Sequence, residues 1–184
     1  PMIFSIFSNP FKKVLEIHFN SEYHNKNIRF ILTGGSCMRQ ERFERITLAY
    51  RRSVGPYGEQ NRRFLEDFKR ELAREQLLGP SSVLLGIALD DPAHVPADRL
   101  RYEVGLVLGR EQRTSLETRV LENGLYAVFE IPHTKAGVLS FWENLPALTA
   151  ELPADRSRPI VERYAAPMIA RHLCEMCVPI IRPL

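Results

Sequence analysis

Cysteine, tryptophan and long apolar runs are scarce in this sequence. Its 184 residues include 3 Cys and 1 Trp, and three cysteines are too few for the disulfide framework of a small secreted protein. No apolar run approaches the ~20 residues that span a bilayer, and the first residues lack the long apolar core and the small-residue cleavage site of a signal peptide. We therefore expect a cytoplasmic protein that does not enter a membrane.

Motifs of catalysis, phosphate binding and metal binding are also missing. We find no nucleophile–base pair, phosphate loop or metal cluster. Cys174 and Cys177 form a CxxC pair, but a redox pair works at a helix N-terminus, and this one falls in a predicted strand, which sends the two sulfurs to opposite faces. A zinc site needs four ligands, and only His172 and the distant Cys37 could complete it. We expect packing roles for both cysteines, no metal and no cofactor.

The composition is that of an ordinary globular protein. The chain is 45% hydrophobic and 26% charged, and its length suits one domain with an appendage. Residues 1–78 contain 14 Lys and Arg against 9 Asp and Glu, whereas the remainder contains 11 against 13. A basic front part could contact nucleic acid, but a solvated charged face is the commoner reason for such a balance.

A strand-helix-strand-strand pattern occupies the first half of the chain after residue 44. Apolar and polar residues alternate from Arg45 to Val54, as in a half-buried strand. Apolar residues then recur at helical spacing from about Glu59 to Leu78, where Gly79-Pro80 stops the pattern. Apolar stretches predict two further strands, from Ser82 to Leu89 and from Leu100 to Leu108.

The same order returns in the second half. A strand is predicted from Leu125 to Ile131, and Thr134 is a plausible N-cap for a helix that ends at Pro146. Two strands follow, Ile160–Tyr164 and Leu173–Ile181. The repeat indicates an internal duplication.

The duplication predicts an α+β fold with two pseudo-symmetric βαββ units, each an antiparallel sheet with one helix. The units span about residues 43–108 and 115–184, and a cleft between two such halves is a natural ligand site. Residues 1–42 fit poorly with this pattern and offer only a short predicted strand, Ile28–Leu32, with turn-like residues before it at 20–27. We interpret them as an N-terminal extension of unknown role that packs on the core or on a second subunit, which makes a homodimer possible.

The strand Ile160–Tyr164 carries the most unusual side chain. It places Glu162 and Tyr164 on one mainly apolar face, and Val161 and Arg163 on the other. A carboxylate on an apolar face must be neutral, paired, or waiting for a cationic partner. The alternative is a half-exposed edge strand, with Glu162 in water or bridged to an arginine.

Six segments of the sequence, in order, match one known family. They are Tyr50–Tyr57 (YRRSVGPY), Asp90–Pro92 with Leu100–Glu103 (LRYE), Gly124–Phe129 (GLYAVF), Phe141-Trp142, Glu162–Tyr164 and Val178–Ile180. Together they resemble the GyrI-like small-molecule-binding domain, which is the effector-binding half of AraC-type and MerR-type transcription regulators and also occurs as free-standing proteins. The resemblance runs from about Arg45 to Leu184.

The resemblance implies a groove between two βαββ units, walled by aromatic residues, in which a glutamate on the penultimate strand meets cationic lipophilic compounds. Glu162 matches that glutamate, Tyr164 matches the aromatic residue two positions on, and Trp142 matches the tryptophan borne by a helix. Further candidate ligand-binding residues are Tyr57, Tyr102 and Tyr126. The implied partner is a small molecule, cationic and aromatic.

The sequence departs from the family pattern at three places. Glu103 stands where Asp is usual, Pro132-His133-Thr134 replaces a glycine-containing link, and no helix-turn-helix is evident in residues 1–40. We therefore expect no direct DNA binding by this chain, and no catalytic residue is assigned. Two alternatives stay open: a hydrolase of small electrophilic compounds that uses Glu162 as base beside Tyr164, and a protein-interaction role such as gyrase inhibition.

Overall fold

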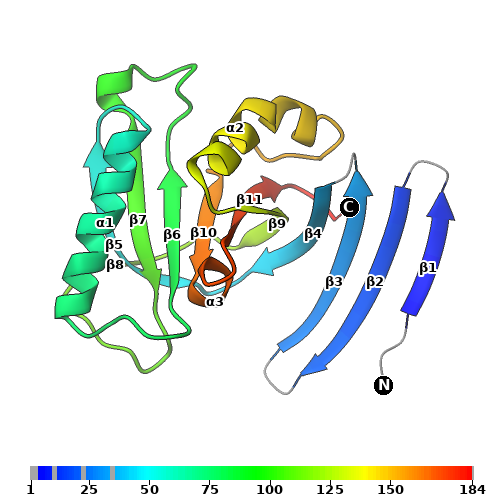
Figure 1. The fold of residues 1–184 in the computed structure, drawn as a ribbon, viewed down its shortest axis with the longest axis horizontal. Helices are drawn as coiled ribbons and strands as arrows, with labels where there is room; N and C mark the ends of the chain where they lie inside the picture. Colours follow the sequence, from blue (N-terminus) through cyan, green and yellow to red (C-terminus); the bar gives the residue numbers. More distant parts are fainter. Residues whose placement is uncertain (1–3, 10–11, 22–23, 34–35, 184) are drawn as a thin grey trace.

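One antiparallel sheet forms the body of the protein, and two long helices cover part of one face (Figure 1). The computed structural model describes the backbone of residues 4–9, 12–21, 24–33 and 36–183, and the side chains of residues 38–183. The strand order is β1-β2-β3-β4-β9-β11-β10-β6-β7-β5-β8. In chain order the elements are β1 (Phe4–Asn9), β2 (Lys12–Ser21), β3 (His24–Thr33), β4 (Ser36–Phe43), β5 (Thr47–Val54), α1 (Glu59–Arg74), β6 (Val83–Ala88), a 3₁₀ turn (Ala97–Arg99), β7 (Arg101–Val107), β8 (Thr118–Val120), β9 (Gly124–Pro132), α2 (Lys135–Thr149), β10 (Val161–Ala165), α3 (Ala166–Ile169) and β11 (Leu173–Ile180).

The predicted α+β class and the predicted order of elements are confirmed. β5-α1-β6-β7 and β9-α2-β10-β11 are the two strand-helix-strand-strand units. The units meet where β6 pairs with β10, and the strand order outward from that junction is the same on both sides, β6-β7-β5 and β10-β11-β9. The strand that carries Glu162 is therefore at the centre of the sheet. A superposable pseudo-twofold relation between the units stays a prediction.

Helix α1 ends four residues before the predicted end. Its buried residues Leu65, Phe68 and Leu72 form the expected apolar stripe, and Gly58 precedes it with a φ of 122°, which is the left-handed region that favours glycine. The helix stops early because Gln76 also takes a positive φ, 56°. This turn lets the backbone N–H of Leu77 bond to the carbonyl of Leu72 at 2.9 Å.

Helix α2 begins as predicted but does not end at Pro146. Thr134 is the N-cap, and its hydroxyl oxygen accepts a hydrogen bond from the Gly137 N–H at 3.0 Å. Pro146 lies inside the helix, which continues to Thr149. A proline removes one backbone hydrogen bond, and a helix that ends within one further turn loses little beyond that bond.

The N-terminal residues form more strand than the sequence indicated. The turn-like segment predicted at 20–27 is shorter in the structure, because β2 continues to Ser21 and β3 begins at His24, with Asn20 opposite Asn25; residues 22–23 between them lie outside the described residues. β4 joins these strands to the rest of the sheet by pairing with β9, Met38 opposite Phe129. In Figure 1, β1–β3 extend away from both long helices. The predicted homodimer through this segment stays untested.

Apolar residues pack on both faces of the sheet. On the helix face, α2 packs through Phe141 against β9 and β11, and α1 packs against β7. On the other face, Val161, Cys177 and Val128 belong to a separate cluster. Both faces of the central strands are therefore buried.

The two cysteines of the CxxC pair lie on opposite faces of β11, as predicted. Cys177 packs with Val161 in the cluster on the face away from the helices. Cys174 lies on the face of Glu162, and burial, together with Glu162, raises the pKa of its thiol to about 12. Burial raises the pKa of Cys177 to about 12 as well, against the influence of Arg163. Both residues are free thiols, and such high pKa values leave almost no thiolate at pH 7, so neither is a reactive nucleophile.

No helix in the described part of the chain has the length and apolarity to cross a membrane.

Candidate functional site

Glu162 is held at the junction of the two units. On β10 it is paired on one side with Gly86 of β6 and on the other with Met176 of β11. The alternation predicted for this strand is confirmed, since Val161 belongs to the cluster on the other face while Tyr164 packs on the helix face. Glu162 is half-buried, so the carboxylate is neither fully solvated nor sealed from solvent.

Three neutral donors converge on the Glu162 carboxylate. The hydroxyls of Tyr102 and Tyr164 each donate to Oε2 at 2.8 Å. The indole Nε1–H of Trp142 donates to Oε1 at 3.3 Å, near the long end of the usual range. No described residue places a cationic side chain in an ion pair with Glu162. The carboxylate is thus hydrogen-bonded without having its charge neutralised.

The two tyrosines are fixed as donors. Burial, and then the charge of Glu162, raise the pKa of Tyr102 well above its usual range, and the same two causes act on the pKa of Tyr164. A tyrosinate beside Glu162 would place two negative charges in a low-dielectric region. Both phenols therefore remain protonated over the physiological pH range.

His133, which was not among the predicted site residues, borders the site. Its ring meets the ring of Tyr164 edge-on, with centroids 5.5 Å apart. Burial lowers the pKa of His133, so the ring is neutral at pH 7 and adds an aromatic surface but no charge. The only signal in the sequence was its place in the Pro132–Thr134 segment, where the chain departs from the family pattern.

The structure brings four of the six predicted aromatic and acidic residues together. Glu162, Tyr164, Trp142 and Tyr102 form one hydrogen-bonded group. Tyr57 stands behind this group, its ring 6.1 Å from that of Tyr102 in an edge-on arrangement. The hydroxyl of Tyr57 lies within hydrogen-bonding distance of the carbonyls of Asp90 and Arg101, which fixes the ring that packs against Tyr102.

Tyr126 is not part of the group. It stacks on Phe43 at a centroid distance of 4.2 Å, under the guanidinium of Arg158. Its contacts place it in the cluster on the face away from the helices. We therefore leave Tyr126 out of the proposed ligand site.

Buried carboxylates on the other face are paired with arginines. Glu103, 1% exposed, accepts hydrogen bonds from Arg52 and Arg119. Glu175, 3% exposed, accepts from Arg163 at 2.5 Å and from Arg39. These ion pairs are the arrangement expected when a buried charge serves the fold alone.

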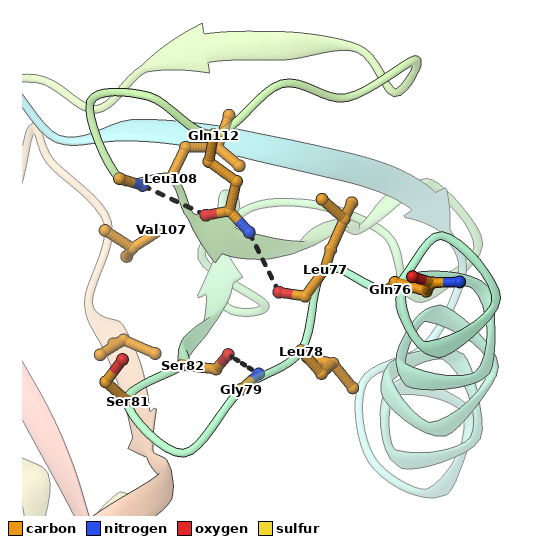
Figure 2. Close-up of a pocket in the computed structure, with 11 residues that line it drawn as sticks. Gln76, Leu77, Leu78, Gly79, Ser81, Ser82, Val107, Leu108 and Gln112 are labelled. Carbon is orange, nitrogen blue, oxygen red and sulfur yellow. Dashed lines mark hydrogen bonds between the residues drawn. The ribbon is translucent and has the colours of Figure 1, made fainter.

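Two cavities are open elsewhere on the protein. One, of about 480 Å³, lies between the C-terminal end of α1 and the start of β6; Figure 2 shows Gln112 bridging Leu108–Gly109 and Leu77 across it. The other, of about 330 Å³, lies beside Arg39, Arg163 and Phe43 on the face away from the helices. Neither contains Glu162.

The structure is an α+β domain in which two long helices cover one face of an antiparallel sheet and a central strand carries Glu162 among aromatic side chains. The family model of the GyrI-like small molecule binding domain matches residues 38–181. The chain belongs to that family, as its sequence motifs predicted.

Known proteins resemble the chain in sequence and in fold. YosT, an SPbeta prophage-derived candidate transcriptional regulator of Bacillus subtilis (strain 168), is 40% identical over 144 residues, which cover 76% of this chain and 96% of YosT. The structure of SAV2435 bound to tetraphenylphosphonium has a TM-score of 0.54 at 14% identity, over 78% of this chain and 93% of that one. The EcmrR C-terminal domain has a TM-score of 0.57 at 6% identity, over 79% and 98%.

Proposed function

We propose that this small-molecule-binding domain takes a cationic, lipophilic molecule over Glu162, as a sensor or a sequestering protein. The observation that carries the proposal is the pairing of Glu162. Its three hydrogen-bond partners, Tyr102, Tyr164 and Trp142, are neutral, so no cationic side chain among the described residues occupies the place beside the carboxylate that a cationic ligand would take.

The surroundings suit a cation with apolar substituents. Aromatic rings attract a cation through the negative faces of their π-systems, by ~0.5–2 kcal/mol for each good contact. The carboxylate contributes more as the ligand excludes water, because a charge–charge interaction strengthens when the local dielectric falls. SAV2435, which shares the fold, is described as bound to tetraphenylphosphonium, a cation of this kind.

We expect one side chain to move when the ligand binds over Glu162. Trp142 is the candidate, because its hydrogen bond to Glu162 is the longest of the three and its side chain is half-buried on α2. Tyr102 is 3% exposed and cannot move without disturbing the core. We therefore expect the ligand to replace the indole N–H at Oε1 while both tyrosines keep Oε2.

Titration with tetraphenylphosphonium, measured by isothermal titration calorimetry, tests the proposal. The wild type should bind in the micromolar range, and Glu162→Gln should weaken binding at least tenfold, because it removes the charge but keeps the shape. Glu143→Gln is the matched control, since Glu143 is exposed on α2 beside Trp142. Triphenylphosphine oxide, a neutral analogue, should bind wild type and Glu162→Gln equally. Equal tetraphenylphosphonium affinity for wild type and Glu162→Gln would overturn the proposal.

The hydrolase hypothesis and the protein-interaction hypothesis predict different results for the same variants. A hydrolase must turn over an activated electrophile in the wild type and lose that turnover in Glu162→Gln. A protein-interaction role, such as gyrase inhibition, must survive Glu162→Gln and be indifferent to tetraphenylphosphonium. The Glu162→Gln variant thus distinguishes all three.

A further inference from the structure

Gly86 lies directly across from Glu162 in the sheet. The two residues are cross-strand partners on β6 and β10. A Cβ atom added at Gly86 would lie 2.1 Å from the hydroxyl oxygen of Tyr102 and 2.8 Å from Oε2 of Glu162. The volume that a side chain would occupy at this position is therefore taken by the Tyr102 hydroxyl and the Glu162 carboxylate, which are hydrogen-bonded to each other.

The backbone of Gly86 gives no reason for glycine. Of the described glycines, those with a positive φ are Gly55 and Gly58, so Gly86 has a conformation that any residue can adopt. A glycine inside a strand weakens it, because its backbone loses more freedom on folding and it offers no side chain to pack. Close approach of other atoms is the remaining reason for a glycine in a central, buried strand.

We propose that Gly86 is a positioning residue of this site, whose missing side chain allows the Tyr102 hydroxyl to reach Glu162. Its consequence for ligand binding rests on the function proposed above. Tyr102 is 3% exposed and meets the ring of Tyr57, and the hydroxyl of Tyr57 is bonded to the carbonyls of Asp90 and Arg101. Tyr102 therefore has no room to retreat from an added methyl group.

A methyl group at Gly86 acts on two atoms of the site at once. It would displace the Tyr102 hydroxyl, which would leave a buried phenol without an acceptor, and it would press on Oε2, the oxygen shared by the two tyrosines. The carboxylate would rotate or withdraw. Both changes alter where the negative charge meets a ligand.

A four-variant cycle tests the proposal without any ligand. Wild type, Gly86→Ala, Tyr102→Phe and the double variant are unfolded in urea, and their equilibrium constants are compared. Gly86→Ala should raise the unfolding constant at least 30-fold in the wild type, and at least fivefold less in the Tyr102→Phe background, because the atom at 2.1 Å is gone while Oε2 of Glu162 at 2.8 Å and Cζ of residue 102 at 3.0 Å remain. An equal effect in both backgrounds overturns the proposal. If Gly86→Ala does not fold, a folded double variant supports the proposal and an unfolded one overturns it.

Gly105→Ala is the matched control. Gly105 is also inside a central strand, β7, and an added Cβ would meet Leu48 at 3.3 Å, away from the site. Its effect on unfolding should be the same in the wild-type and Tyr102→Phe backgrounds. If Tyr102→Phe reduces the effect of Gly105→Ala on unfolding as much as it reduces the effect of Gly86→Ala, the effect does not come from the contact between residue 86 and the Tyr102 hydroxyl, and the proposal is overturned.

Binding of tetraphenylphosphonium provides the second measurement. Under the proposed function, Gly86→Ala should lose at least tenfold in affinity and Gly105→Ala less than threefold; equal losses in the two variants overturn the positioning role in binding. If the wild type does not bind tetraphenylphosphonium, the proposed function fails at that step. The unfolding cycle then still decides whether Gly86 positions Tyr102.

Discussion

The carboxylates on the two faces of the sheet have opposite kinds of partner. On the face away from the helices, Glu103 and Glu175 each meet two arginines. On the helix face, Glu162 meets two phenols and an indole. Adjacent residues of β10 belong to the two systems, since Arg163 pairs with Glu175 and Glu41 while Glu162 lies on the other face.

Under the proposed function, this difference separates a charge that serves the fold from a charge that serves ligand binding. Arginine and carboxylate charges that neutralise each other leave little net field for a third partner. Neutral donors satisfy the lone pairs of a carboxylate but leave its charge in place, and in a low-dielectric region that charge is strongly felt by a cation. The face with the arginines should therefore hold the fold together, and the face with the tyrosines should recognise a ligand.

The largest expected effect concerns the arginine face. Arg163→Met removes the cation that bonds Glu41 and Glu175, whose side chains are 14% and 4% exposed. Breaking a buried pair by removing one partner leaves an uncompensated charge, so we expect a loss of about 3 kcal/mol in the free energy of unfolding. Urea unfolding measures it.

Arg163→Lys is the control for charge without the planar guanidinium. It should lose less than Arg163→Met, because the ammonium still faces both carboxylates. A loss below about 1 kcal/mol for Arg163→Met would mean that these ion pairs behave as surface pairs, and the contrast between the faces would disappear.

The next effect concerns the tyrosine face at alkaline pH. The pKa values of Tyr102 and Tyr164 are raised in the folded protein by burial and then by Glu162, whereas in the unfolded chain they are near 10. The unfolded state thus releases protons first as the pH rises. The contribution of these two phenols to stability is fully present below about pH 10 and declines above it, by at most about 1.4 kcal/mol per pH unit for each tyrosine.

Unfolding in urea between pH 8 and pH 11 measures this decline. The double variant Tyr102→Phe/Tyr164→Phe should show a shallower decline than the wild type. Four groups with raised pKa values remain in that variant and account for the residual slope: the phenols of Tyr57 and Tyr126 and the thiols of Cys174 and Cys177. An unchanged slope would contradict the assignment of Tyr102 and Tyr164 as protonated donors.

The site could be predicted from the sequence only where the pattern was local. The alternation in residues 160–164 gave the correct faces for Glu162 and Tyr164, and Thr134 gave the start of α2. Tyr126 and Tyr102 could not be told apart, because both lie in strands whose two faces are buried, and such strands lack the polar alternation that marks a face.

Features that depend on neighbouring strands could not be predicted. The pairing of β4 with β9 and the short edge strand β8 exist through partners distant in sequence. Gly86 is one residue of an apolar stretch, and its importance follows from the position of the Tyr102 hydroxyl. Register and side-chain reach decide these contacts, and neither is encoded in a local pattern.

A smaller effect is expected from neutralising Glu162 itself. In Glu162→Gln the side-chain carbonyl can still accept from the tyrosines, and the cost of keeping a half-buried charge disappears. We expect the free energy of unfolding to change by less than about 1 kcal/mol. Glu175→Gln, which leaves Arg39 and Arg163 without a charged partner at this position, should lose about 2 kcal/mol or more. Equal losses would show that both carboxylates serve the fold in the same way.

The smallest effect concerns the indole of Trp142. Trp142→Phe removes the 3.3 Å hydrogen bond to Glu162 but keeps an aromatic ring on α2, and a long neutral hydrogen bond contributes little net free energy. The affinity for tetraphenylphosphonium, measured by calorimetry, should fall about threefold, since both aromatic faces attract a cation and tryptophan does so more strongly. Trp142→Ala should lose more, because it removes the ring as well. A tenfold loss in Trp142→Phe would mean that the N–H orients the carboxylate toward the ligand, and the indole would then be a third fixed donor beside the two tyrosines.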